Sequence, residues 1–434
     1  MSMTTYDERI GAAEAGFLNG LLRFDRSMTT ALEGLDDDIA WRPAIVIRQA
    51  YRYLVGGMRP PVAVCEAIQR IEPVAAPKLE SAHLAAVKHL LRGAFGDASR
   101  TLLDISREFP DDVLALAAGH QVDFLSGTPR IQLARLTASP LLREGSSPAY
   151  PYLLAMLAFA YGENGEYAKS YEAATRAMSI APDDNPRAVH ACAHTLFETR
   201  EHRAVSELLA TTRTGWMSDD CLLGMHLTWH YALNSMAAAD RDALTERTAE
   251  LTGVLGPECS PMQFCDVVSL LWRLRLAGLA EPSQFDIAAD IALDMRSSSN
   301  SAFVDMHILL AIVGAGRYQR AAEVAREMCA DRADIAAHLS GTRRTAVGIA
   351  DSFVHYCQSN REQAVRRLTS ILPAVIDMGG SVVQRDLALE LLVACGRGRV
   401  GPSAIVPGID VSTRPLVTNR SYESGAARGP AALG

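Results

Sequence analysis

The sequence lacks the features that mark several large classes of protein. It contains no apolar run of 18 residues, so it predicts no transmembrane helix. The opening stretch, MSMTTYDERIGAAEAG, includes acidic residues and lacks the apolar core of a signal peptide, which makes the cytoplasm the expected compartment. A clear alternation of apolar and polar residues is also missing, so β-strands are not expected.

The chain also lacks a large excess of positive or negative charge, and its cysteines do not occur in closely spaced pairs. The formal net charge is −8, the pI is about 5.8, and no basic patch with interleaved aromatic residues occurs, so we expect no nucleic-acid partner and no membrane partner. The eight cysteines show no C-x-x-C spacing and lie mostly in apolar helical windows. They are expected to be buried thiols in a reducing compartment. Nothing in the sequence indicates an oligomeric state.

What the sequence does contain is a repeated helical pattern. Aromatic residues make up only 6% of the chain while alanine and leucine are abundant, which favours packed helices. Turn markers followed by a helix start lie at Gly93, Gly127, Gly165, Arg200, Ala238 and Gly316. The first five are 34, 38, 35 and 38 residues apart, close to the tetratricopeptide period, and GEYAKSYEAATRAMSIAPDD is the best single match. The sequence therefore predicts an all-α, tetratricopeptide-like superhelix of helical hairpins, a solenoid.

This prediction divides the chain into three parts. Residues 1–40 are expected to form a helix and a loop, and residues 41–398 the solenoid. Residues 399–434 are rich in glycine, proline and serine and have no helical period, so they are expected to form a flexible tail.

Two His-x-x-x-His pairs form the most unusual feature of the chain. They are His190 with His194 and His226 with His230. With 11 histidines in 434 residues, chance placement gives about 0.3 such pairs. Each pair shares a helix face, and the pairs are one repeat apart. We therefore expect all four imidazoles on adjacent inner helices, because the first helix of each repeat lines the concave surface.

Other polar or aromatic residues lie within the apolar sequences that are predicted to form the inner helices. They are His120, Asp123, Glu163, Trp229, Asp266, Arg273, Asp305, His307, Gln384, Arg385 and Asp386. Since an unpaired buried polar group costs about 1–3 kcal/mol, these groups should either satisfy one another or bind a ligand.

Three interpretations of the histidines stay open at this stage. The first is a hydrogen-bonded network of His, Asp and Arg that fixes the inner face. The second is the binding of a small polar ligand or a peptide. The third is a site for a divalent metal such as zinc, held by the four histidines, with Asp123, Glu163 and Glu198 as nearby carboxylates.

Individual side chains carry narrower expectations. Trp216, Trp229 and Trp272 should belong to the core. Gln384, Arg385 and Asp386 should pair with Asp266 or Asp305 rather than clamp an anion. Asp305 and His307 are two residues apart and should not form a dyad by themselves.

The chain resembles the tetratricopeptide repeat protein 38 family. The matching segments are AHLAAVKHLLRG, GHQVDFLSG, LAMLAFAYGENGEY, AVHACAH, HLTWHYAL, DVVSLLWRL, FVDMHILLA with GAGRY, and GGSVVQRD. The resemblance covers roughly residues 80–390, and it implies a closed or strongly curved helical-repeat fold in which the inner polar residues named above are family features. It departs from the family pattern at DDNPRAV, Phe197, Leu227, Thr228 and Val382.

Two functions remain as hypotheses. In the first, the repeat protein binds a peptide or small polar ligand in a concave channel lined by His, Asp and Arg. In the second, it is a metal-assisted enzyme that acts on a small metabolite at the same histidines. An open groove would favour the first, and a closed cavity with converging histidines would favour the second.

Overall fold

The protein is described here by a computed structural model covering residues 6–72, 77–182, 185–330 and 335–396. These ranges contain 24 α-helices, three short 3-10 helices and two isolated β-bridges, with no strand among them. The predicted all-α class is confirmed. The predicted tail, residues 399–434, lies outside the described residues.

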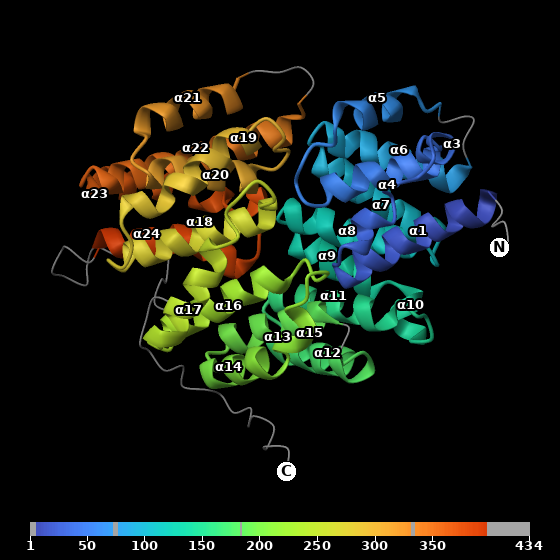
Figure 1. Ribbon diagram of the computed structural model, residues 1–434, viewed down its shortest axis with the longest axis horizontal. Helices are drawn as coiled ribbons and strands as arrows, with labels where there is room; N and C mark the ends of the chain where they lie inside the picture. Colours follow the sequence, from blue (N-terminus) through green and yellow to red (C-terminus); the bar gives the residue numbers. More distant parts are fainter. Residues whose placement is uncertain (1–5, 73–76, 183–184, 331–334, 397–434) are drawn as a thin grey trace, which may run out of the picture.

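The helices follow one another through short turns (Figure 1). They are α1 (Tyr6–Arg23), α2 (Ser27–Thr30), α3 (Asp37–Ala40), α4 (Pro43–Leu54), α5 (Val62–Arg70), α6 (Lys78–Leu91), α7 (Phe95–Glu108), α8 (Val113–Leu125), α9 (Pro129–Thr137), α10 (Pro140–Glu144), α11 (Tyr150–Glu163), α12 (Tyr167–Ile180), α13 (Pro186–Glu198), α14 (His202–Thr211), α15 (Arg213–Trp216), α16 (Gly224–Ala237), α17 (Arg241–Thr252), α18 (Pro261–Leu276), η2 (Pro282–Phe285), α19 (Asp286–Met295), α20 (Ala302–Gly314), α21 (Tyr318–Met328), α22 (Ala337–Cys357), α23 (Arg361–Ile371), η3 (Leu372–Ala374), η4 (Ile376–Met378) and α24 (Val382–Gly396).

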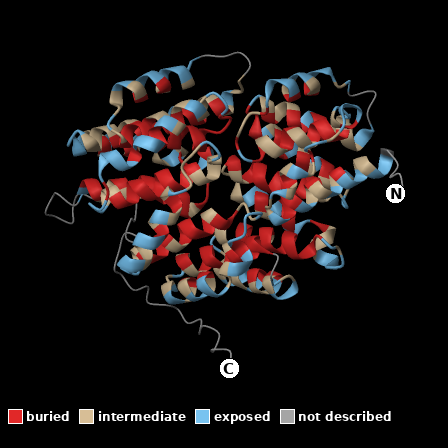
Figure 2. Ribbon diagram, viewed as in Figure 1, coloured by how far each residue is buried: buried red, intermediate tan, exposed pale blue. Residues whose placement is uncertain are grey.

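Inner and outer helices alternate along the chain. Helices α8, α11, α13, α16, α18 and α20 are buried over nearly their whole length, whereas α7, α12, α14, α17, α21 and α23 bury only one stripe. Figure 2 shows the buried helices at the centre and the exposed faces at the rim. The arrangement of adjacent helix pairs is consistent with an α-helical solenoid. The inner helices carry the polar residues singled out from the sequence.

Left-handed turn residues mark the start of each outer helix. Positive φ values occur at Gly93, Gly127, Gly165, Arg200, Ala239, Gly278, Gly316 and Ser359, at intervals of 34 to 43 residues. The sequence located most of these turns but missed those at Gly278 and Ser359, where the sequence offered a weaker signal. The turn predicted at Ala238 has its left-handed residue one position later.

Hydrogen bonds between distant segments close the helical array on itself. The amide of Arg59 donates to the carbonyl of Ser298 at 2.7 Å, and the amide of Ala336 donates to the carbonyl of Arg92 at 2.7 Å. At the end of α11 the carboxylate of Glu163 accepts the Val382 amide at 3.0 and 3.1 Å, which caps the first turn of α24. The blue and orange helices of Figure 1 accordingly lie next to each other.

The segment before residue 41 is built into this closed array. Helix α1 packs against α4, α8 and α11. Phe17 and Leu21 are fully buried there. The short helices α2 and α3 follow it. The N-terminal segment therefore contributes to the central core.

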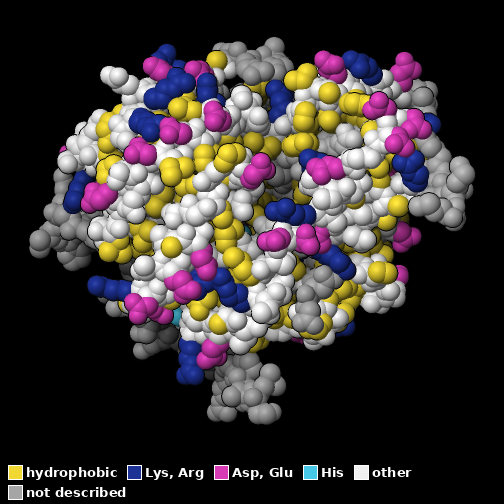
Figure 3. Space-filling view, in the orientation of Figure 1, with side chains coloured by type: hydrophobic (Ala, Val, Ile, Leu, Met, Phe, Trp, Pro, Cys, Tyr) yellow, Lys and Arg dark blue, Asp and Glu magenta, His cyan; other side chains and the backbone are white. Residues whose placement is uncertain are grey.

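The outside of the molecule is mixed in charge. Figure 3 shows acidic and basic side chains interspersed over the visible face. Exposed ion pairs such as Arg203 with Glu207 connect neighbouring side chains on this surface. None of the helices in the described ranges combines the length and the apolar character needed to cross a bilayer.

Candidate metal centre and adjoining pocket

Four imidazoles converge in the interior of the molecule. Helix α13 presents His190 and His194 on one face, and the neighbouring inner helix α16 presents His226 and His230. One nitrogen from each ring lies within 4.8 Å of the others. His194, His226 and His230 are buried, and His190 is partly buried. The sequence-based expectation that the two pairs meet on adjacent inner helices is therefore met.

The start of α13 is fixed by its cap. Asn185 accepts a hydrogen bond from the Ala188 amide at 3.2 Å, and Pro186 occupies the first helical position. Both features favour helix initiation at this point. His190 and His194 consequently project from the second and third turns of a well-defined helix.

A carboxylate orients one of the four rings. Asp266, on α18, accepts the Nδ1 hydrogen of His226 at 2.9 and 3.0 Å. Asp266 is 1% exposed, so this hydrogen bond is shielded from water. With the hydrogen of a neutral imidazole on Nδ1, the Nε2 atom of His226 carries a lone pair that points into the cluster. This is the arrangement that commonly fixes a metal-binding histidine.

Hydrogen bonds between the four rings do not provide a partner for every ring nitrogen. The Nε2 atom of His190 lies 3.0 Å from Nε2 of His194 and 3.1 Å from Nε2 of His226. A single neutral nitrogen carries either one hydrogen or one lone pair, so His190 cannot fully satisfy both neighbours. Neither ring nitrogen of buried His230 has a hydrogen-bond partner within the described structure. The purely structural network is thus incomplete.

Burial keeps three of the rings, those of His190, His194 and His230, neutral. Burial, aided by repulsion from the His226 ring, lowers the pKa of His194 to about 3. Burial and neighbouring imidazoles also lower the pKa of His190 and of His230 well below the usual value. Neutral imidazoles are the form that ligates metals.

Aromatic rings hold the cluster from two sides. Phe159 stacks on His190 with ring centroids 5.5 Å apart. On the other side Trp229 stacks on His226 at 5.2 Å. Trp216, Trp229 and Trp272 are all buried at 1% exposure or less, which confirms the prediction that they belong to the core.

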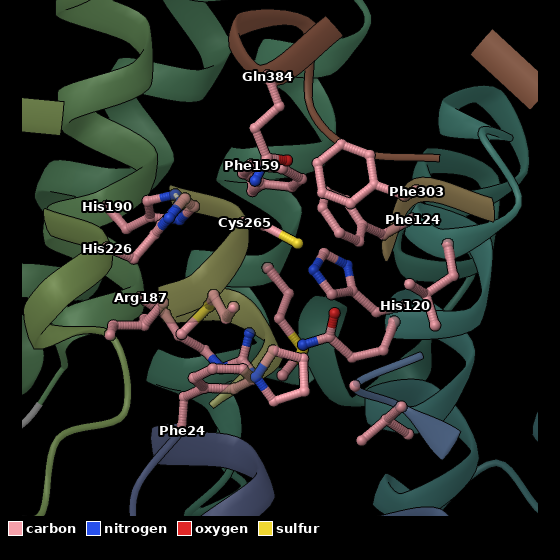
Figure 4. A pocket seen from close by; sticks show the side chains of 18 of the residues that line it. Phe24, His120, Phe124, Phe159, Arg187, His190, His226, Cys265, Phe303 and Gln384 are labelled. Carbon is pink, nitrogen blue, oxygen red and sulfur yellow. Dashed lines mark hydrogen bonds between the residues drawn. The ribbon is translucent and has the colours of Figure 1, made fainter. Parts of the chain in front are cut away.

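A pocket of about 140 Å³ adjoins the cluster. Its walls come from seven helices and three loop segments between Phe24 and Gln384. Figure 4 shows His190 and His226 on one side with His120 opposite. Apolar side chains dominate the lining, including Phe24, Phe124, Phe159 and Phe303. The lining polar residues are His120, Gln121, Arg187, His190, His226, Cys265 and Gln384.

Of the 15 site residues predicted from the sequence, only some border this space. His120, His190, His226 and Gln384 line the pocket, and His194 and His230 complete the cluster. The structure places the remaining nine outside the pocket lining: Asp123, Glu163, Trp229, Asp266, Arg273, Asp305, His307, Arg385 and Asp386.

Most of these nine have structural partners. Asp123 pairs with Arg135 at 2.9 Å, with both side chains fully buried. Arg273 pairs with Glu390 at 3.0 Å and donates to the carbonyl of Val383 at 2.8 Å. These contacts connect helices to one another, so they indicate a structural role for Asp123 and Arg273 rather than ligand binding.

The acidic partner expected for Arg385 was wrong, and Asp305 pairs with a different arginine. Arg385 pairs with Glu163 at 3.4 Å, and Asp305 pairs with Arg343 at 2.7 Å. Gln384 accepts the Ser381 amide at 2.9 Å and caps α24. Asp305 and His307 form no dyad, as expected, because His307 Nδ1 donates to the Phe303 carbonyl at 2.8 Å. The partners differ because chain closure brings α24 to the end of α11.

The three carboxylates considered beside the histidines have other contacts. Asp123 and Glu163 are engaged as described above, and Glu198 accepts from the Tyr167 hydroxyl at 3.4 Å. Asp266 holds the position next to the cluster instead. Its location one repeat after His226 could have indicated this, since stacked inner helices align equivalent positions.

Sequence reasoning missed Arg187. It lies three residues before His190 and therefore on the same face of α13. Its side chain is 8% exposed and lines the pocket. Burial lowers its pKa to about 9, so the guanidinium is still charged at neutral pH.

Fold and site together define an all-α helical-repeat protein with a buried four-histidine cluster beside an apolar pocket. A scan of the chain against protein-family models finds no matching model. All eight cysteines are free thiols.

Proposed function

We propose that the protein is a metal-dependent enzyme that transforms a small organic molecule in the pocket beside the four histidines. One observation carries the proposal: nitrogens of His190, His194, His226 and His230 lie within 4.8 Å of one another. Such convergence of imidazole nitrogens is costly without a common ligand, because nitrogens of neighbouring rings compete for the same hydrogen-bond partners.

Distances support a shared ion. Two imidazole nitrogens bound to one tetrahedral zinc lie roughly 3.3 Å apart, given zinc–nitrogen bonds of about 2.0–2.1 Å. The two closest nitrogen pairs in the cluster are at 3.0 and 3.1 Å. Imidazole ligands suit zinc, copper, iron and nickel, so a divalent transition metal such as zinc fits this donor set.

The neighbouring residues have roles that suit catalysis. A bound metal would supply a Lewis acid that polarises an oxygen of the substrate or of water. His190 and His226 border both the metal centre and the pocket, and Asp266 keeps His226 in the required tautomer. The apolar walls would exclude bulk water from the bound molecule.

The fold proposal follows from the repeat spacing. We infer that the array is a tetratricopeptide superhelix of the tetratricopeptide repeat protein 38 family and that the protein acts in the cytoplasm. The turn spacing of 34 to 43 residues and the inner position of the family-like polar residues support this assignment.

A non-catalytic binding protein is the second candidate. If all four histidines ligate one tetrahedral ion, no position is left for substrate, which is typical of structural sites. The metal would then brace α13 against α16. A small polar ligand or a peptide segment would bind in the channel without being transformed.

Elemental analysis of purified, tag-free protein tests the metal. The wild type and the control His89→Ala, at a half-buried histidine outside the cluster, should contain a near-stoichiometric divalent metal. The His190→Ala/His226→Ala double variant should lack it while keeping its helical circular dichroism. If the wild type takes up no zinc, iron or manganese, the metal-dependent function is refuted.

Metal-dependent turnover then separates the two candidates. Chelator-treated and metal-reloaded protein would be compared on a panel of small metabolites by mass spectrometry. Turnover restored by the metal supports the enzyme. Metal that raises thermal stability with no turnover of any bound compound supports the binding protein.

A further inference from the structure

The pocket contains one buried charge that nothing neutralises. Arg187 donates from Nε to the Leu22 carbonyl at 2.8 Å and from Nη2 to the Leu21 carbonyl at 2.8 Å. These carbonyls lie at the end of α1, and neither is an anion. Within the described residues, no carboxylate pairs with this guanidinium and no hydrogen bond is made by Nη1.

The rest of the lining offers no compensating charge. Across the described part of the chain, no aspartate or glutamate lines the pocket. Burial lowers the pKa of His120 well below its usual value, and burial raises the pKa of the Cys265 thiol well above its usual value, so both groups are neutral. The cation has only neutral contacts, namely the two carbonyls and the Phe24 ring, whose centroid lies 4.6 Å from Cζ of Arg187. A buried charge without an opposite charge is costly, and an anionic ligand would offset that cost.

A second side chain in the pocket lining has a ring nitrogen without a hydrogen-bond partner. His120 is 4% exposed and lines the pocket opposite the cluster, yet its Nδ1 atom makes no hydrogen bond to any described residue. Figure 4 shows the His120 ring and the Arg187 side chain pointing into the same space. Two buried polar groups thus face one cavity.

Size and wall chemistry limit the ligand. The volume of about 140 Å³ is similar to that of an engineered apolar cavity that holds benzene, about 150 Å³. Four phenylalanine rings, Met156 and Met262 belong to the largely apolar walls. A compact aromatic or aliphatic body fits this space, whereas a sugar or a peptide would leave its hydroxyl or amide groups unpaired.

We infer that the pocket binds a small monocarboxylate with an apolar body, whose carboxylate pairs with Arg187. A single guanidinium balances one negative charge, while a phosphate dianion would bring excess charge among apolar walls. Arg187 and His190 are one helical turn apart on α13, so the carbon next to the carboxylate would lie toward the metal centre. The inference rests on the proposed function for this orientation only.

Calorimetric titration of the full chain tests it with three acids and their neutral isosteres. Phenylacetate, benzoate and hexanoate would be compared with phenylacetamide, benzamide and hexanamide at pH 7. We expect at least one acid to bind about 10- to 100-fold more tightly than its amide. Arg187→Gln should abolish this preference, and Arg187→Lys should keep part of it.

Arg187 also holds α1, so Arg187→Gln could unfold the protein. The Ala155→Leu variant therefore fills the pocket from another wall, and it should remove binding of the acids while circular dichroism stays unchanged. Equal binding of acid and amide, binding that survives Ala155→Leu, no binding of any acid, or tighter binding of phenyl phosphate than of phenylacetate would overturn the inference.

The titrations are run on chelator-treated and on metal-loaded protein. Acid binding through Arg187 in a chain that takes up no metal would uphold this inference and refute the metal-dependent function. Metal uptake at the histidines without acid binding would do the reverse.

Discussion

At the scale of single residues, the role of a buried polar side chain depends on its partner and on its surroundings. Asp266 and His226 form one such pair, and Asp123 and Arg135 form another at a different place in the core. The first pair directs a lone pair toward three other imidazoles, whereas the second links α8 to α9. Similar residue types thus serve different purposes, and the difference lies in what surrounds them.

Asp266→Asn should weaken metal binding without unfolding the chain. The amide keeps the size of the side chain but no longer favours a hydrogen on His226 Nδ1, so the ring loses its fixed orientation. Loss of such a partner typically lowers metal affinity about 10- to 100-fold. Competition with a coloured chelator measures this. The exposed Asp290→Asn is the control, and equal affinity in both variants would show that Asp266 does not orient a ligand.

Arg135→Met should destabilise the fold and leave the metal content unchanged. It strands the fully buried Asp123 carboxylate, and breaking a buried pair costs about 3–5 kcal/mol of unfolding free energy. The double variant Asp123→Leu/Arg135→Met should recover much of that loss. Urea unfolding and elemental analysis check both points. Loss of metal in a folded Arg135→Met protein would instead connect this pair to the site.

At the scale of elements, close contact between a turn and a distant segment secures the closed array. Gly127 follows α8 with φ of 64°, and an added Cβ would overlap the carbonyl oxygen of Ile376 in η4. Gly165 follows α11 with φ of 77°, yet nothing lies within 4 Å of its added Cβ. The two glycines share a backbone conformation and differ in what they face.

Gly127→Ala should therefore cost clearly more stability than Gly165→Ala. Both substitutions force an L-residue into the left-handed region, at about 1–2 kcal/mol. Only Gly127→Ala also pushes η4 away from α8, which adds the cost of overpacking, about 1–3 kcal/mol. Urea midpoints of the two variants give the comparison. Equal midpoints would mean that the contact at Ile376 does not hold the array closed.

The sequence predicted what depends on local patterns and failed where distant segments meet. Helical periodicity and turn markers gave the helices, and the repeat spacing brought His190 and His226 together. The partner of Arg385 was assigned wrongly because Glu163 is 222 residues away along the chain. Arg187 was overlooked for the same reason, since its contacts are carbonyls 165 and 166 residues earlier. The repeat period predicts which helices are neighbours in the stack, but it does not predict which distant helices meet when the array closes.

At the scale of the whole molecule, buried neutral histidines make stability depend on pH. Burial lowers the pKa of His307 to about 4 and that of His194 to about 3, below the value of about 6.5 in an unfolded chain. Between about pH 6.5 and 4 the unfolded chain therefore binds more protons than the folded one. The free energy of unfolding falls as the pH falls through this window.

His307→Gln should reduce this dependence. Each such histidine lowers the free energy of unfolding by about 2 kcal/mol between pH 6.5 and pH 5. Urea unfolding of chelator-treated wild type and variant at pH 7 and pH 5 gives the difference of differences, which removes the effect of other titrating groups. A variant that loses as much stability as the wild type would show that His307 is not kept neutral by the fold.

The pocket walls run from Phe24 to Gln384, and this span has a consequence for biosynthesis. A ribosome must release nearly the entire chain before the walls can meet, so no nascent fragment can retain a ligand in the pocket, whereas the four histidines lie within residues 190–230 and can meet much earlier. Contacts across such sequence separations form late and slowly. The histidine cluster can therefore assemble in a nascent chain while the pocket beside it still lacks the wall that Gln384 contributes.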